Sequence, residues 1–127
     1  MKSLQLSYIF ASIWAAFILF ATIASTSSLQ ELALKDLFQF DKPIHATLFG
    51  VQAWLLIRAR LQQAYQSYLT IIVVSCLAST SYGMLTEYLQ KWLTTSRTFD
   101  LYDFVADTIG CLIVAIWFLS KRKAFAQ

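Results

Sequence analysis

Charged residues, glycine and proline are all scarce in this sequence of 127 residues. Asp, Glu, Lys and Arg together make up 13% of the chain, whereas soluble domains carry about 25%. Three glycines and one proline leave little material for the turns of a β-rich fold, so helices are the expected elements. Hydrophobic residues make up 58% of the chain. This composition excludes an ordinary soluble domain and predicts a single helical domain that contacts the lipid bilayer.

Cysteine is scarce as well. Cys76 and Cys111 each lie near the middle of an apolar run and form no C-x-x-C pair, so we expect free cysteines at helix contacts rather than a disulfide or a thiolate metal site. The net charge is +3, but the Lys and Arg residues form no patch with interleaved aromatics. No nucleic-acid partner is therefore expected. The sequence also shows no recognised metal-ligand spacing, so no metal and no cofactor are expected.

Long intervals without charge predict four membrane-spanning helices, at residues 4–24, 41–60, 68–89 and 101–120. The first follows Lys2 and is longer than the ~7–15-residue core of a signal peptide, so we expect it to be retained. The last uncharged interval, 108–120, is too short to cross a ~30 Å hydrocarbon core. The fourth helix therefore has to carry Asp103 and Asp107 into its outer part.

The distribution of basic residues predicts the orientation of these helices. Four spans place both termini and the 58–67 loop on one side, which carries six basic residues and no acid: Lys2, Arg58, Arg60, Lys121, Arg122 and Lys123. The other side carries four basic residues and all seven acids. Basic residues favour the cytoplasmic side, so both termini are expected there. Leucines recur through the first outer loop (residues 25–40), where we also expect a short interfacial helix.

Three polar clusters are predicted to meet at the outer face. The first is Asp41, Lys42 and His45 at the start of the second helix, where Asp41 and His45 are four residues apart and share a helical face. A helix cap and an interfacial lysine would explain Asp41 and Lys42 without any function. They would not explain an imidazole one turn deeper in the membrane.

The second cluster ends a stripe of small residues on the third helix. Ser75, Ser79 and Gly83 recur every four residues, a pattern that lets neighbouring helices approach closely. The same stripe continues to Glu87, and Gln90 follows about one turn later. Because a carboxylate facing lipid is costly, Glu87 is expected to face the interior of the bundle.

The third cluster runs into the fourth helix. Arg97 precedes Asp100, Asp103 and Asp107, and the acids are three and four residues apart, so they share one stripe with Gly110. Asp107 lies about a turn or more inside the predicted span, and an ionisable group at that depth is a functional candidate that needs a partner. The candidate partners are His45, Lys42 and Arg97.

These clusters predict one ligand-binding site of nine residues: Asp41, Lys42, His45, Glu87, Gln90, Arg97, Asp100, Asp103 and Asp107. Within it, His45, Glu87, Asp103 and Asp107 are the candidates for acid–base catalysis. Several alternatives stay open. The cluster suits a general acid–base pair, a hard cation or a phosphate bound by Lys42 and Arg97, but a polar network that only holds the helices together is equally consistent with it. No Ser or Cys nucleophile lies beside these residues in the sequence.

Taken together, the clusters resemble the VanZ-like family of small bacterial membrane proteins. The family's Asp-Lys-x-x-His segment and the aromatic residue after it correspond to Asp41, Lys42, His45 and Phe49. Its Tyr-Gly-x-x-x-Glu-x-x-Gln segment corresponds to Tyr82, Gly83, Glu87 and Gln90. Its last segment corresponds to Arg97, Asp100, Asp103 and Gly110. The resemblance covers residues 6–120. One position departs from the pattern, because Asp107 stands where the family usually has Asn, which leaves open whether a charge belongs there.

The resemblance implies a multi-pass protein of the bacterial cytoplasmic (inner) membrane. The family is named after a protein associated with reduced susceptibility to the glycopeptide teicoplanin, so the resemblance implies that this chain binds or modifies a lipid-linked component of the cell envelope. Two alternatives remain from the residues themselves. One is a non-catalytic membrane scaffold, and the other is a membrane hydrolase or transferase that uses His45 and Glu87. Whether the protein is an enzyme is thus left open.

Overall fold

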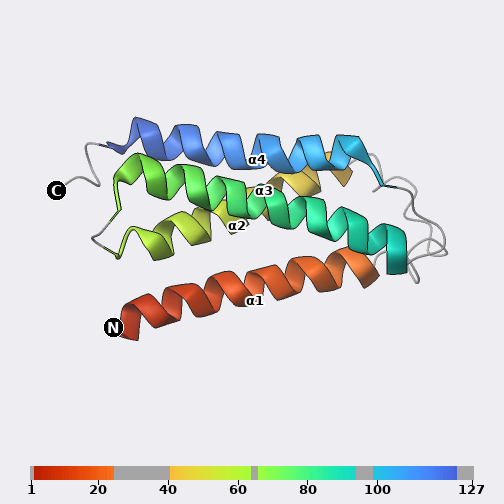
Figure 1. Ribbon diagram of the computed structural model, residues 1–127, viewed down its shortest axis with the longest axis horizontal. Helices are drawn as coiled ribbons and strands as arrows, with labels where there is room; N and C mark the ends of the chain where they lie inside the picture. Colours follow the sequence, from red (N-terminus) through yellow and green to blue (C-terminus); the bar gives the residue numbers. More distant parts are fainter. Residues whose placement is uncertain (1, 25–40, 64–65, 94–98, 123–127) are drawn as a thin grey trace.

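Four helices make up the structure, a computed structural model that describes residues 2–24, 41–63, 66–93 and 99–122 (Figure 1). They are α1 (Lys2–Ala24), α2 (Asp41–Arg60), α3 (Tyr68–Leu93) and α4 (Leu101–Ser120). No strand occurs in the described ranges, so the expected all-helical fold is confirmed. The expected ranges 41–60 and 101–120 coincide with α2 and α4, whereas α3 continues to Leu93 instead of ending at 89. The expected interfacial helix in the first outer loop lies outside the described residues.

Neighbouring helices in the chain run in opposite directions (Figure 1). The last turns of α1 and α3 and the first turns of α2 and α4 therefore lie at the same end of the bundle, which we call the site end. The start of α1 and the end of α4 lie at the opposite end. This arrangement brings the start of α2, the end of α3 and the start of α4, which carry the three polar clusters, into one region.

The outward surface of the bundle is apolar. Three helices contain stretches long and apolar enough to cross a membrane: Leu4–Ile23 in α1, Tyr68–Leu93 in α3 and Leu101–Ser120 in α4. Large hydrophobic side chains such as Phe20, Leu77 and Ile116 are more than 60% exposed, as they are in a protein that is solvated by lipid. The chain is thus a helical membrane protein. α2 is not one of these three helices, because charges occupy both of its ends.

α2 and α4 pack in parallel along a seam of small residues. Two hydrogen bonds across this seam join residues that are 62 positions apart in the chain. They connect His45 with Asp107 and Cys111 with Phe49. Gly110 lies directly against the carbonyl group of Ala46, and a Cβ atom at Gly110 would overlap it. Both cysteines are free, and Cys111 is buried at this contact, as its small size predicts.

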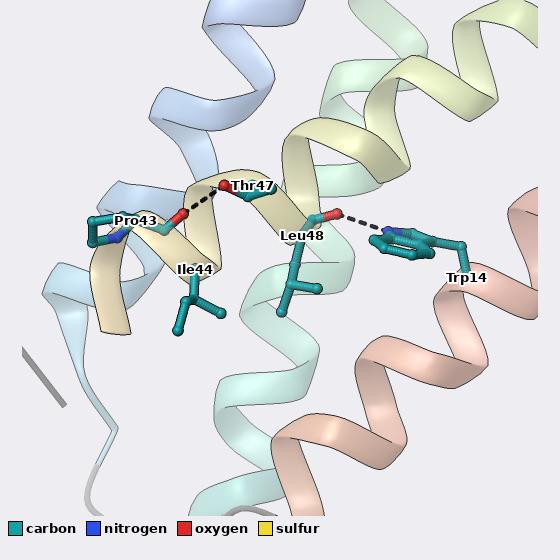
Figure 2. Close-up of a pocket in the computed structure, with 5 residues that line it drawn as sticks. All are labelled: Trp14, Pro43, Ile44, Thr47 and Leu48. Atoms are coloured by element: carbon teal, nitrogen blue, oxygen red, sulfur yellow. Dashed lines mark hydrogen bonds between the residues drawn. The ribbon is translucent and has the colours of Figure 1, made fainter. Parts of the chain in front are cut away.

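α1 is attached to the other helices by side chains that donate hydrogen bonds to backbone carbonyl groups. The indole Nε1 of Trp14 donates to the carbonyl oxygen of Leu48 at 3.0 Å (Figure 2). The Tyr82 hydroxyl donates to Ala15 at 2.6 Å. In a membrane interior such polar groups need protein acceptors, because no solvent supplies them. These bonds fix the position of α1 beside α2 and α3.

Candidate functional site

The small-residue stripe on α3 faces the bundle interior and ends at the site. Ser75, Ser79, Gly83 and Glu87 are all buried, so the orientation predicted from their spacing is confirmed. Ser79 donates from its hydroxyl to the carbonyl oxygen of Phe49 at 2.9 Å, which holds α3 close to α2. The stripe thereby carries the Glu87 carboxylate into the interior, where only 2% of it is exposed.

The acidic stripe on α4 divides into a structural residue and two buried ones. Asp100 is the N-cap of α4, and its Oδ1 accepts a hydrogen bond from the backbone N–H of Tyr102 at 2.8 Å. This bond satisfies one of the unpaired N–H groups at a helix start. Asp103 and Asp107 follow on the inner face and are buried. The helix start therefore explains Asp100, but it leaves the two deeper acids to be explained by other contacts.

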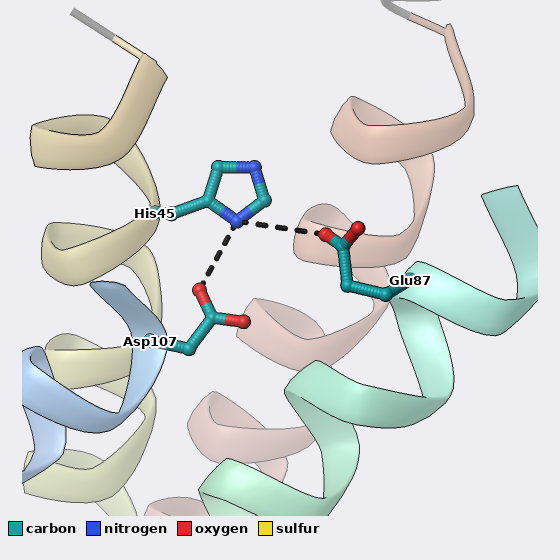
Figure 3. Close-up of side chains that lie close together, drawn as sticks. All are labelled: His45, Glu87 and Asp107. Carbon is teal, nitrogen blue, oxygen red and sulfur yellow. Dashed lines mark hydrogen bonds and ion pairs between the residues drawn. The ribbon is translucent and has the colours of Figure 1, made fainter. Parts of the chain in front are cut away.

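His45, Glu87 and Asp107 converge from three different helices (Figure 3). The His45 Nδ1 atom lies 3.0 Å from Asp107 Oδ1 and 3.9 Å from Glu87 Oε1. All three side chains are at most 4% exposed. Of the three candidate partners of Asp107, the structure places His45 beside it. We call these three residues the buried triad.

A glycine makes room for this arrangement. A Cβ atom at Gly83 would lie 2.5 Å from Asp107 Oδ2 and 3.2 Å from its Cγ, far closer than side chains normally approach. The Asp107 carboxylate therefore lies directly against the backbone of α3. The Tyr-Gly pair in the sequence thus has two separate functions in the fold, since Tyr82 attaches α1 and Gly83 accommodates Asp107.

Lys42 pairs with a different acid. Its Nζ lies 3.7 Å from Asp103 Oδ1, and its side chain is 53% exposed while that of Asp103 is 4% exposed. The ammonium also lies 5.8 Å from the centre of the Tyr102 ring. Lys42 is thus positioned at the rim of the site, with its aliphatic stem over the bundle and its charge accessible from outside.

The remaining predicted site residues lie around the triad or outside the described part. Gln90 is buried, and its Nε2 donates to the carbonyl oxygen of Thr22 in α1 at 3.1 Å, so this amide helps to attach α1. Arg97 and the side chain of Asp41 lie outside the described residues. The structure therefore brings together Lys42, His45, Glu87, Asp103 and Asp107, and it gives Asp100 and Gln90 contacts that belong to the fold.

The triad can exchange protons and can offer ligand atoms to a cation. An ionised carboxylate only accepts hydrogen bonds, so Asp107 favours the tautomer of His45 that is protonated on Nδ1 and leaves Nε2 as the basic nitrogen. Within the described residues, the triad is also a set of His, Glu and Asp ligand atoms that all lie within 4.8 Å of one another. No metal-ligand spacing is visible along the sequence because each of these residues comes from a different helix.

Two contributors were missed by sequence reasoning. They are the Trp14 indole and the Tyr82 hydroxyl, to which the sequence pattern alone assigns no partner. Both donate to backbone carbonyl groups across helix contacts. A signal for them was present, because an indole N–H or a phenol in the middle of an apolar span needs an acceptor from another helix. Which helix supplies the acceptor depends on packing.

Comparisons of this chain with protein-family profiles, with curated proteins and with solved structures give no match. The function therefore has to be inferred from the geometry of the site.

Proposed function

We propose that the chain crosses the bacterial cytoplasmic membrane four times, with both termini in the cytoplasm and the site end at the outer face. α1 and α3 run in the same direction (Figure 1). If both span the membrane, the chain has to cross back between them, and α2 is the helix that connects them. Its 20 residues extend about 30 Å, the thickness of the hydrocarbon core. Its basic residues, Lys42, Arg58 and Arg60, lie near its ends, where they reach the interfaces.

Within this arrangement the protein binds the anionic head group of a lipid-linked envelope component at the outer leaflet. The observation that carries this proposal is the position of Lys42. Its half-exposed ammonium lies at the rim of the buried polar site, at the end of the bundle that the topology places in the outer leaflet. A cation in that position attracts a phosphate group. The VanZ-like resemblance points to the same class of ligand, and we propose membership of that family on the three sequence segments described above.

An apolar groove near the start of α2 suits the lipid part of such a ligand. It lies between α1 and α2 and is lined by Trp14, Pro43, Ile44, Thr47 and Leu48 (Figure 2). Its polar atoms are already paired, since the Thr47 hydroxyl donates to the carbonyl oxygen of Pro43 at 2.8 Å and the Trp14 indole donates to Leu48. The groove therefore offers an almost purely apolar surface in the same half of α2 as Lys42.

Removing the Lys42 charge tests this proposal. We expect Lys42→Gln to weaken binding of an undecaprenyl-phosphate probe to the purified protein in nanodiscs by about tenfold, measured by native mass spectrometry, because one charge-assisted contact is lost. Lys91→Gln is the matched control, since Lys91 lies in the last turn of α3, at the same end, and is exposed. Equal affinities for the two variants, or no saturable binding by the wild type, would contradict the proposal.

A second candidate function is a membrane hydrolase or transferase with His45 as general base. The hydrogen bond of 3.0 Å between His45 and Asp107 favours it, because a carboxylate that orients an imidazole raises its basicity. His45→Ala and Glu87→Gln separate the alternatives in a glycopeptide-susceptibility assay run with protein quantification. Loss of the phenotype at normal abundance would exclude the scaffold. Loss of abundance in both variants would indicate that the triad mainly stabilises the fold.

A further inference from the structure

The buried triad has the chemistry of a metal-binding site. It supplies one imidazole nitrogen and two carboxylates from three helices, with all ligand atoms within 4.8 Å of one another. The separations of 3.0 and 3.9 Å from His45 Nδ1 (Figure 3) are close to the spacing of two ligands on one small cation, whose bonds are about 2.0–2.2 Å long. Only small movements of these side chains would be needed for all three to coordinate one ion.

An unpaired carboxylate oxygen points to the same conclusion independently. Glu87 Oε1 is buried and has no hydrogen-bond partner among the described residues. It faces His45 Nδ1 at 3.9 Å, which is too far for a hydrogen bond. A buried carboxyl oxygen without a hydrogen-bond partner is costly in a low-dielectric interior, and a cation removes that cost. The atom is therefore in the position of a ligand.

The donor set selects the class of ion. We propose that His45, Glu87 and Asp107 bind a divalent first-row transition-metal ion such as Zn²⁺ or Mn²⁺. The two carboxylates match a charge of two, and the imidazole favours these ions over Mg²⁺ and Ca²⁺, which prefer oxygen ligands alone. On binding, the neutral imidazole of His45 carries its proton on Nε2 instead of Nδ1, so that Nδ1 is free to coordinate, and Asp107 changes from a hydrogen-bond acceptor to a ligand.

Three protein ligands leave a coordination position for an oxygen atom from outside the protein. A phosphate oxygen of the proposed head group would suit that position. Metal binding by the triad nevertheless does not require the head-group proposal, because the ion is held by the protein's own side chains. The two proposals are tested separately, since Lys42 is not a ligand in the triad.

Metal content and affinity test the site directly. The full chain is purified in detergent without a polyhistidine tag, its metal content is measured by inductively coupled plasma mass spectrometry, and Zn²⁺ is titrated by calorimetry. We expect about one ion per chain for the wild type. Glu87→Gln and Asp107→Asn should each weaken Zn²⁺ binding by more than about 100-fold, because changes to groups that only support a ligand already cost about 10–100-fold.

Asp100→Asn is the matched control, because it removes a carboxylate at the same end of the bundle while Asn still caps α4. It should bind Zn²⁺ like the wild type. If Asp100→Asn weakens binding as much as Glu87→Gln does, or if a folded Glu87→Gln protein binds like the wild type, the triad is not the site. Circular dichroism and size-exclusion chromatography establish which variants are folded.

Cobalt replacement keeps the test decisive if the variants fail to fold. Wild-type protein loaded with Co²⁺ should show the intense visible absorption of a four- or five-coordinate ion, and Zn²⁺ should displace it. The weak spectrum of hexaaqua Co²⁺ together with no measurable Zn²⁺ binding would overturn the metal proposal. That result would leave the Lys42 experiment unaffected, so failure of the metal site and failure of the head-group site can be told apart.

Discussion

Asp107 is held between a glycine on one helix and a histidine on another. Its carboxylate lies against the backbone at Gly83 and 3.0 Å from His45 Nδ1, and it is fully buried. A carboxylate in the hydrocarbon region needs such a partner, because neither water nor lipid can stabilise its charge. At the scale of single residues, the absence of a side chain at Gly83 is therefore as important to the triad as the imidazole.

Gly83→Ala is the residue-scale prediction. Alanine favours a helix over glycine by about 1 kcal/mol, so without the Asp107 contact the substitution would stabilise α3. The added Cβ instead lies 2.5 Å from Asp107 Oδ2, and Asp107 has to rotate away from His45. We expect a net loss of about 1–3 kcal/mol in the free energy of unfolding, a range typical of overpacking. Unfolding by SDS in mixed micelles measures it.

A double substitution shows whether the loss comes from this contact. Asp107→Ala removes the carboxylate, so adding Gly83→Ala to it should cost little more and leave a clear coupling energy between the two positions. Ala78→Ser serves as a comparison of equal size change at an exposed position of α3. If Gly83→Ala is as stable as the wild type, Asp107 does not lie against α3.

Packing between whole helices depends on contacts between backbone atoms, which, unlike side chains, cannot avoid a clash by rotating. Along the α2–α4 seam, a Cβ atom at Gly110 would overlap the backbone carbonyl group of Ala46. A Cβ atom at Gly50 would meet the Gly110 carbonyl oxygen at the milder distance of 3.2 Å. The two glycines occupy the same contact but leave different amounts of space, so they form a natural pair of substitutions.

We expect Gly110→Ala to destabilise the bundle by about 3 kcal/mol or more, and Gly50→Ala by clearly less. The reason is that α4 has to move away from α2 in the first case, whereas a shift of a few tenths of an ångström suffices in the second. Separation of the helices also moves Asp107 away from His45. Unfolding midpoints of the two variants in the same micelle system provide the measurement. An equal loss of stability in the two variants, or a larger loss for Gly50→Ala, would contradict the close contact of Gly110 with Ala46.

The helices themselves were predictable from the sequence because their cause is local. Uncharged intervals set the lengths of the helices, and four-residue spacing identified the buried faces of α3 and α4. The offset between helices is different, since it depends on contacts such as Gly110 with Ala46 that join segments far apart in the chain. Spacing within one helix determines a face but not the partner at the same depth. That is why Asp107 had three candidate partners until packing selected His45.

At the scale of the whole molecule, the polar site could be predicted to gather at one end but not to divide into parts. Alternating helix directions bring all its segments together, which follows from helix order alone. The division between Asp100 as a helix cap, Gln90 as an attachment for α1 and the buried triad depends on side-chain partners. The sequence shows polar residues in all three roles, and only their three-dimensional contacts show which role each one has.

The proposed four-span topology predicts which ends of the helices face the periplasm. In a background with Cys76→Ala and Cys111→Ala, single cysteines are introduced as Lys91→Cys at the site end and as Gln62→Cys and Lys121→Cys at the other end. Four spans with a cytoplasmic N-terminus place Lys91→Cys outside and the other two inside. A membrane-impermeant maleimide should therefore label intact cells only at position 91. If the four spans had the opposite orientation, with the N-terminus outside, all three results would reverse. Labelling at 62 and 121 but not at 91 would thus show that the orientation is inverted and that the triad opens to the cytoplasm.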